Sequence, residues 1–228
     1  MNTVSQRPEM KRSENPQFSR AEERAHYLSH GVGAAFAIPA VAFLVLLAAR
    51  RGPTTLIGCA IYGGALVLMY ATSTAYHMTP FARPRTKHVF HVLDHCAIFL
   101  LISGTYTPLA LTVLHNAQGY LLLALVWVLS FFGLYLVALR RNPRRGGPIF
   151  LYLAIGWVVA LTLPELMRAL GDRALLLLFF GGVFYTLGVP FYALRRLRYH
   201  HAIWHGFVLI GSALHFVAMF YFVVPYPN

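Results

Sequence analysis

Two histidines one helical turn apart are the first residues of this chain whose types and spacing suggest chemistry. His201 and His205 have the spacing by which one helix offers two imidazole nitrogens to one metal ion. Ser73 and His77 have the same spacing earlier in the chain, and Asp94 follows His77 after seventeen residues. Three imidazoles with a fourth position open are the ligand set of a catalytic zinc site, in which the metal lowers the pKa of water to about 7. A carboxylate such as that of Asp94 is then a candidate general base.

The composition indicates that these residues lie in a membrane protein. The 228 residues are 58% hydrophobic and only 11% charged, with a mean hydropathy of +0.59. The formal charge of +12 does not indicate a nucleic-acid partner, because the basic residues occupy short breaks between apolar runs. Cys59 and Cys96 both lie inside such runs, which excludes a disulfide scaffold and a cysteine-based zinc module.

The apolar runs predict an all-α integral membrane fold, a bundle of seven transmembrane helices. Residues 1–25 have no apolar core and are predicted to form a polar cytoplasmic tail, neither a signal peptide nor a span. The membrane domain is predicted over residues 26–224, followed by a short outer tail at 225–228. Each run is close to the roughly 20 residues that a helix needs to cross a bilayer. The seven runs are 26–49, 54–77, 89–114, 119–139, 149–167, 174–194 and 201–224.

The distribution of lysine and arginine predicts the orientation. Fifteen of the 19 fall on the side of the N-terminus, and only Arg50, Arg51, Arg168 and Arg173 fall on the other. Because cytoplasmic loops retain positive charge, the N-terminus is predicted to be cytoplasmic and the C-terminus outside. The loops are short and rich in glycine and proline, so any function must lie within the bundle.

This topology predicts that the candidate residues converge. The second helix ends, and the third and seventh helices begin, at one depth near the cytoplasmic face. His77, Asp94, His201 and His205 are therefore expected to lie close together, and ionisable groups within a membrane are functional-site hypotheses by default.

Simpler interpretations remain open for each of these residues. Histidines near a membrane interface are often amphipathic anchors, and one pair at this spacing is a weak motif. Ser73 has an ordinary alternative as an interhelical hydrogen bonder. Asp94 has one as an ion-pair partner of the basic residues before it, Arg83, Arg85 or Lys87. His215, about ten residues deeper than His205, is expected to be a packed histidine, and Glu165 is expected to lie too far away to join the cluster.

Three groups of residues carry a resemblance to a known family. They are Glu22–Glu23 with Ser29–Gly33, then Ser73 and His77 with Leu93–Asp94, and finally Tyr199–His205 with Gly211–Phe216. In type and spacing the chain resembles the hemolysin III proteins, the bacterial branch of the progestin and adipoQ receptor (PAQR) family, which in turn resembles the alkaline ceramidases.

The resemblance implies a zinc ion near the cytoplasmic side of a bundle in the bacterial inner membrane. Its ligands would be His77, His201 and His205; Asp94 would contact the water at the zinc, and Ser73 would lie one turn before the first ligand. His26 is a departure, because asparagine is expected there in relatives. It makes a fourth imidazole available nearby.

Three functions follow as hypotheses. The leading one is a zinc-dependent membrane hydrolase that cleaves a lipid amide (C–N) or ester entering from the bilayer, with Asp94 and Ser73 as catalytic residues. The second is a membrane sensor or stress-response protein without turnover, whose zinc is structural and closed by Asp94 or a fourth histidine. The third is a pore-forming hemolysin, which short loops and the lack of an amphipathic lytic segment disfavour.

Two other classes of seven-helix protein are excluded. A retinal protein needs a lysine in the seventh span, whereas the lysines here are Lys11 and Lys87. A G-protein-coupled receptor would have its N-terminus outside, opposite to the distribution of charge. The residues leave open which divalent ion three imidazoles would bind, since geometry and availability decide that.

Overall fold

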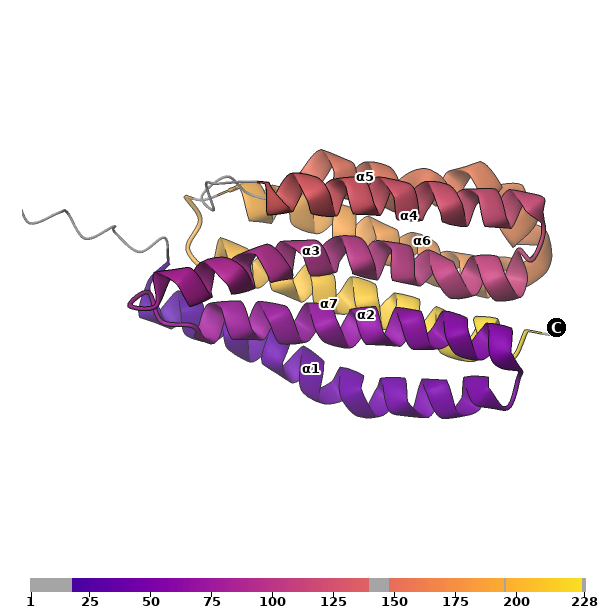
Figure 1. Cartoon of the computed structure of the whole chain (residues 1–228), viewed down its shortest axis with the longest axis horizontal. Helices are drawn as coiled ribbons and strands as arrows, with labels where there is room; N and C mark the ends of the chain where they lie inside the picture. Colours follow the sequence, from indigo (N-terminus) through magenta and orange to yellow (C-terminus); the bar gives the residue numbers. More distant parts are fainter. Residues whose placement is uncertain (1–17, 140–147, 195, 227–228) are drawn as a thin grey trace, which may run out of the picture.

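The chain folds into a bundle of helices that run back and forth along one axis (Figure 1). The structure, a computed structural model, describes residues 18–139, 148–194 and 196–226. In this part of the chain there is no β-strand, which confirms the all-α prediction. The α-helices are α1 (Arg20–Ala49), α2 (Pro53–Met78), α3 (Pro84–Pro108), α4 (Ala117–Ala138), α5 (Ile149–Trp157), α6 (Leu163–Ala193) and α7 (His200–Ala218). π-Helical turns extend α3 over Leu109–Val113 and α7 over Met219–Val223, and a 3-10 turn, Val158–Thr162, joins α5 to α6.

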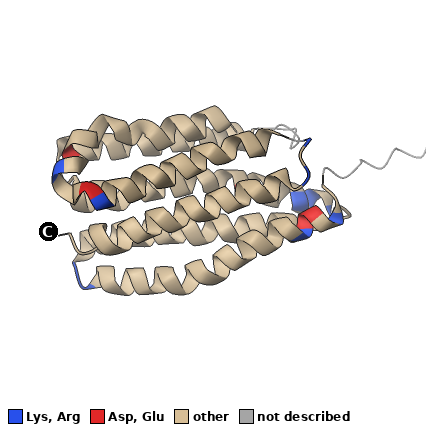
Figure 2. Ribbon diagram, turned by 180° about the vertical axis from the view of Figure 1, so that it is seen from behind, with Lys and Arg blue, Asp and Glu red and all other residues tan. Residues whose placement is uncertain are grey.

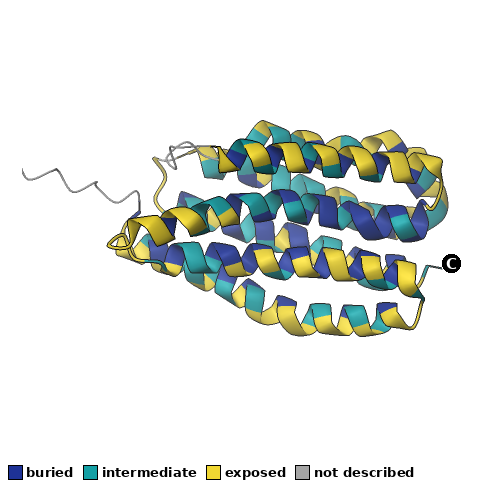
Figure 3. Ribbon diagram, viewed as in Figure 1, coloured by how far each residue is buried: buried dark blue, intermediate teal, exposed yellow. Residues whose placement is uncertain are grey.

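The surface of the bundle suits lipid. Within the described residues, six helical stretches are long and apolar enough to cross a membrane. Charged residues gather at the two ends of the bundle and are absent from most of its length (Figure 2). Exposed positions cover the outward sides of the helices (Figure 3), and large apolar side chains such as Phe150, 92% exposed, occupy them. An apolar surface of this extent is stable only in hydrocarbon.

The longest of the six stretches contains a break. It comprises α5, the 3-10 turn and α6, which together span the 45 residues Ile149–Ala193. Gly171, inside α6, has the non-helical dihedral angles φ 72° and ψ 171°, a region that glycine enters without strain. The chain therefore changes direction within the short connection expected between residues 167 and 174.

The first helix begins earlier than the apolar pattern predicted. Ser19 caps α1 through a capping box: its hydroxyl accepts from the Glu22 backbone N–H at 3.2 Å, and the Glu22 carboxylate accepts from the Ser19 N–H at 2.9 Å. The residues around the cap include Phe18 and Glu23, both of them buried. Part of the segment predicted as a polar tail thus belongs to the bundle, while residues 1–17 of that tail lie outside the described residues.

Three helices meet at the end of the bundle where α1 begins, here called the proximal end. α1 packs along α2 and also against α7. Gly33 allows this approach, since a Cβ there would lie 2.7 Å from Tyr70 Cε1 on α2 and 2.8 Å from Leu209 Cδ2 on α7. The absence of a side chain at residue 33 brings the first two turns of α1 against the ends of α2 and α7 that carry the candidate histidines.

Candidate metal centre

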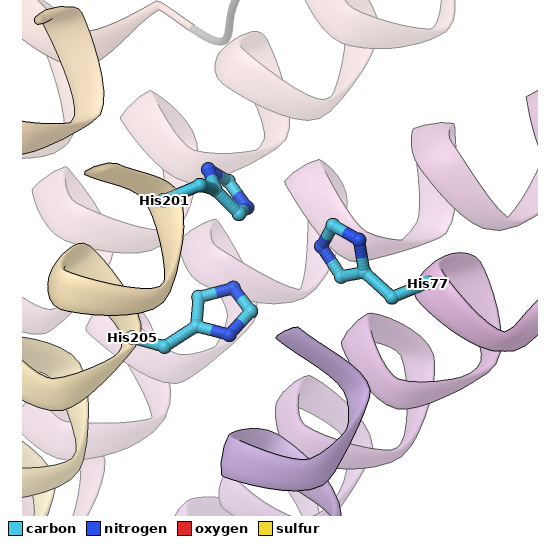
Figure 4. Close-up of side chains that lie close together, drawn as sticks. All are labelled: His77, His201 and His205. Atoms are coloured by element: carbon cyan, nitrogen blue, oxygen red, sulfur yellow. The ribbon is translucent and has the colours of Figure 1, made fainter. Parts of the chain in front are cut away.

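Three imidazole rings meet at the proximal end of the bundle. His77 comes from the last turns of α2, and His201 and His205 come from the first turns of α7, with their rings directed into the space between the two helices (Figure 4). One ligand atom from each lies within 4.8 Å of the other two. The structure therefore brings together the three histidines that the sequence predicted to converge.

Helix α1 binds the outward nitrogens of two of these rings. His77 Nδ1 lies 2.6 Å from Glu23 Oε2, so this N–H donates to the carboxylate. His205 Nδ1 lies 2.9 Å from Ser29 Oγ and 3.2 Å from the carbonyl oxygen of His26. A carbonyl only accepts, so Nδ1 of His205 carries its proton and Nε2 keeps its lone pair. Both rings therefore present Nε2 as the nitrogen available for a ligand.

The donor set fits a metal ion. His77 Nε2 is buried and has no hydrogen-bond partner among the described residues, and a buried nitrogen without a partner is costly. Histidines that ligate metals usually donate their second ring N–H to a carboxylate or a carbonyl, which fixes the tautomer. His77 donates its Nδ1–H to the Glu23 carboxylate, and His205 donates its Nδ1–H to the carbonyl oxygen of His26, so both rings have this arrangement.

Glu23 contacts His77 of the candidate centre, a contact that the sequence did not predict. Its second oxygen, Oε1, accepts from Lys87 Nζ at 3.1 Å. Lys87 also donates to the carbonyl oxygens of Tyr76 at 3.1 Å and Thr79 at 3.0 Å, so it joins α3 to the end of α2. The capping box at Ser19 and the recurrence of polar residues every three to four positions after it were the signals that could have placed Glu23 on a helix face.

Asp94 and Ser73 lie beside the three histidines and not among their converging nitrogens. Both are buried, and both line one cavity together with His201 and His205. Asp94 belongs to neither group of converging ligand atoms found in the described residues. Of the basic residues considered as its ion-pair partners, Lys87 binds Glu23 instead. Asp94 Oδ2 lies 3.9 Å from Nδ1 of His95, on the wall of the cavity.

The cavity is apolar along most of its walls and has a volume of about 150 Å³. At the proximal end its polar lining includes Asp94, Ser73 and the two histidines of α7, and it continues past Leu101 to His215. His201 and His215 are separated by about 21 Å along α7, at a rise of about 1.5 Å per residue. The lining suits an apolar group of a ligand, with polar side chains at one end.

Two further histidines of α1 surround the centre. The His26 ring centroid lies 4.6 Å from that of His77 and 4.9 Å from that of His201. Glu23, His26 and His77 form the second group of residues in the described part of the chain whose ligand atoms converge. His30 stacks on His205, with ring centroids 3.5 Å apart and planes 11° apart. His26, where asparagine is expected in relatives, thus lies beside the three histidines of the centre.

Phe18 covers the histidines from the proximal side. Its ring centroid lies 4.7 Å from that of His26, 5.4 Å from that of His201 and 6.2 Å from that of His77. Phe18 is itself only 6% exposed. An apolar ring in this position limits the access of water to the centre from the proximal side.

The remaining candidates have local partners. His215 Nε2 lies 3.0 Å from the carbonyl oxygen of Leu178, as expected for a packed histidine. Glu165 is contacted by Arg168, 3.2 Å away on the same turn of α6. His95, whose role the sequence left undecided, lies 3.3 Å from the hydroxyl of Tyr192.

Comparison with known proteins extends the resemblance to nearly the whole chain. The family described as "Haemolysin-III related" matches residues 18–216. A "Hemolysin-3 homolog" of Bacillus subtilis (strain 168) is 36% identical over 211 residues, which cover 92% of this chain and 98% of the relative. "Hemolysin-3" of Bacillus cereus is 35% identical over 205 residues, covering 90% and 93%. The human "Monocyte to macrophage differentiation factor" is 28% identical over 173 residues, covering 74% and 71%. The chain is therefore an integral, multi-pass membrane protein that belongs to the haemolysin III family.

Proposed function

We propose that this protein is a zinc-dependent membrane hydrolase that cleaves the amide bond, or a corresponding ester bond, of a membrane lipid. The observation that carries the proposal is the convergence of three imidazoles, two of which line the polar end of an apolar cavity together with Asp94 and Ser73. An acyl chain in the cavity would place its carbonyl group at that end. The substrate would enter from the bilayer, in which the protein is embedded.

A topology of seven crossings accompanies this proposal. The break at Gly171 divides the 45-residue stretch into two segments, each close to the length that a bilayer requires. An odd number of crossings, together with the concentration of lysine and arginine on the N-terminal side, indicates a cytoplasmic N-terminus and an outer C-terminus. The metal centre would then lie near the cytoplasmic face of the inner membrane.

His77, His201 and His205 would hold the metal ion. Three neutral imidazoles suit zinc. The ion would contribute Lewis acidity toward the substrate carbonyl and toward a water molecule.

The protein's own groups would perform the proton transfers. Asp94 accepts a proton from the attacking water, and the oxygen of that water forms the new bond to the carbonyl carbon. As the C–N bond breaks, Asp94 returns the proton to the departing nitrogen, so the products are a fatty acid and an amine. The Ser73 hydroxyl donates a hydrogen bond to the carbonyl oxygen as negative charge develops there.

The experiment that tests this function is a hydrolysis assay on detergent-purified protein with a panel of ceramides, other N-acyl lipids and matched esters. We expect release of fatty acid by the wild type, and loss of at least a hundredfold in rate for Asp94→Asn with its zinc content unchanged. His77→Ala is expected to lose both zinc and activity. Glu165→Gln, which alters a carboxylate of α6 paired locally with Arg168, serves as the control. No hydrolysis across the panel by zinc-loaded wild type would contradict the proposal.

A second candidate function is favoured by one observation, the additional imidazole of His26 beside the three histidines. If the ion has four protein ligands, it holds α1, α2 and α7 together as a structural metal. The protein would then act as a membrane sensor or stress-response factor that catalyses no reaction. Removal of the metal would lower the stability of the bundle.

A further inference from the structure

We propose that His26 is a fourth ligand of the metal ion, so that the resting centre is closed by four imidazoles from three helices. This inference rests on the metal-binding part of the proposed function and not on hydrolysis. It gives α1 a direct role in the centre, in addition to the hydrogen bonds that Glu23 and Ser29 supply.

The ring centroids of the four histidines lie at the corners of a rough tetrahedron, whereas the ligand atoms of only His77, His201 and His205 lie within 4.8 Å of one another. The centroid distances from His26 are 4.6 Å to His77, 4.9 Å to His201 and 5.7 Å to His205. Those among the other three are 5.1 Å, 5.3 Å and 4.6 Å. Four imidazoles on one tetrahedral zinc ion, with Zn–N distances of about 2.0–2.1 Å, have ring centres about 5 Å apart. All six separations lie close to that value.

The buried ring of His26 has no hydrogen-bond partner among the described residues. The side chain is 0% exposed. Its Nδ1 lies 3.7 Å from Glu23 Oε2, the oxygen that accepts from His77 Nδ1. One carboxylate oxygen thus faces the Nδ1 atoms of two rings. Ligation through Nε2 would satisfy the buried ring. It requires the ring to turn until Nε2 faces the nitrogens of the other three histidines, and a small shift would bring Nδ1 within hydrogen-bonding distance of Glu23.

His30 is the competing candidate, and its geometry disfavours it. It is also buried without a hydrogen-bond partner in the described part of the chain. However, its ring lies parallel to that of His205 at a centroid distance of 3.5 Å. Two imidazoles stacked in this way cannot direct nitrogens along two separate tetrahedral directions toward one ion. His26 meets the rings of His77, His201 and His205 at interplanar angles of 62° to 74°, as tetrahedral ligands can.

A centre of this kind has no open position at rest. An external ligand or a substrate binds only where it replaces the His26 ring, and Phe18, which packs on that ring, restricts its movement. Shortening residue 26 to asparagine would leave three imidazoles and open the fourth position. The identity of residue 26 therefore decides whether the centre is closed or open.

The test uses the full-length protein in detergent, with X-ray absorption at the zinc edge and visible spectroscopy after replacement of zinc by Co²⁺. We expect four imidazoles per zinc in the wild type and three in His26→Asn. The cobalt spectrum of the wild type should not respond to added azide, whereas that of His26→Asn should shift, and added imidazole should restore the wild-type spectrum. The control is His91→Asn, whose ring packs on Tyr76 and His95 at the same end of the bundle. It should behave as the wild type does.

The outcomes separate this inference from the proposed function. Three imidazoles and one oxygen in the wild type, with an azide response equal to that of His26→Asn, would overturn it even if hydrolysis is found. Four imidazoles in the wild type support it, whatever the hydrolysis assay shows. The number of imidazoles per zinc is measured on the wild type alone, so the inference can still be tested if His26→Asn folds poorly. A wild type that binds no metal would overturn both proposals.

Discussion

Glu23 Oε2 lies 2.6 Å from Nδ1 of His77, a contact between the first turn of α1 and the end of α2. The other oxygen of the same carboxylate is bound by Lys87, so the carboxylate is held from both sides. A carboxylate in this relationship orients a histidine and raises its affinity for a metal. The hydrogen bond from His77 to the Glu23 carboxylate thereby joins the first helix to the centre.

Replacing Glu23 by glutamine should weaken metal binding while leaving the fold intact. The amide cannot supply negative charge to the His77 N–H, and loss of such a partner typically lowers metal affinity about 10–100-fold. Competition between the protein and a zinc chelator measures this change. Glu22→Gln is the matched control, since that carboxylate caps α1 at Ser19 and accepts from the Tyr199 backbone N–H, and no hydrogen bond joins it to His77 in the described residues. Equal affinities for Glu23→Gln and Glu22→Gln would contradict the role assigned to Glu23.

A side chain at residue 33 should separate α1 from the centre. In Gly33→Val the new Cβ would clash with Tyr70 and Leu209, which lie on two different helices. We expect a loss of about 1–3 kcal/mol in stability, as for other overpacked sites, together with weaker zinc binding. Thermal unfolding in detergent and chelator competition measure the two effects. Gly64→Val is the control, because a Cβ at Gly64 meets nothing within 4 Å, and a similar loss there would show that the close approach at Gly33 is unimportant.

The proposed seven crossings predict which side of the membrane each connection faces. In a background of Cys59→Ala and Cys96→Ala, a cysteine at Asp172 should react with a membrane-impermeant maleimide in intact cells. A cysteine at Arg85 should react only after permeabilisation. If Ile149–Ala193 instead crossed once, residue 172 would lie within the hydrocarbon and would not be labelled in either condition. Labelling of Arg85→Cys in intact cells would reverse the predicted orientation.

Filling the cavity should change the length of lipid that the protein accepts. Leu101 lines the cavity about 10 Å from Asp94 along α3, at a rise of about 1.5 Å per residue. Leu101→Trp should lower kcat/KM for long-chain N-acyl lipids at least tenfold and spare short-chain ones, since each methylene excluded from an apolar pocket costs about 1–3 kcal/mol. Fatty acid release from substrates of graded length measures this. Leu121→Trp, at an exposed position on α4, is the control, and an equal loss for all lengths would argue against the cavity as the acyl site.

Much of the fold could be predicted because local sequence determines it. Apolar runs of about 20 residues require helices in lipid, where each backbone polar group must be satisfied within its own segment. The spacing of His201 and His205 within a single helix likewise decides that both rings share a face. The expected meeting of these two with His77 followed from the alternating directions of the helices, and the structure brings the three rings together.

Only the tertiary structure decided what surrounds those three rings. Glu23 and Phe18 lie in a segment without an apolar run, and they are buried because α1 starts at the Ser19 cap and packs against α2 and α7. Lys87 binds Glu23 and not Asp94, a choice between partners on different helices that depends on how those helices pack. The near-tetrahedral position of His26 and the placement of Asp94 on the cavity wall depend on the rotation of α1 and α3 about their axes. Hydropathy carries no information about such rotations, because interhelical packing determines them.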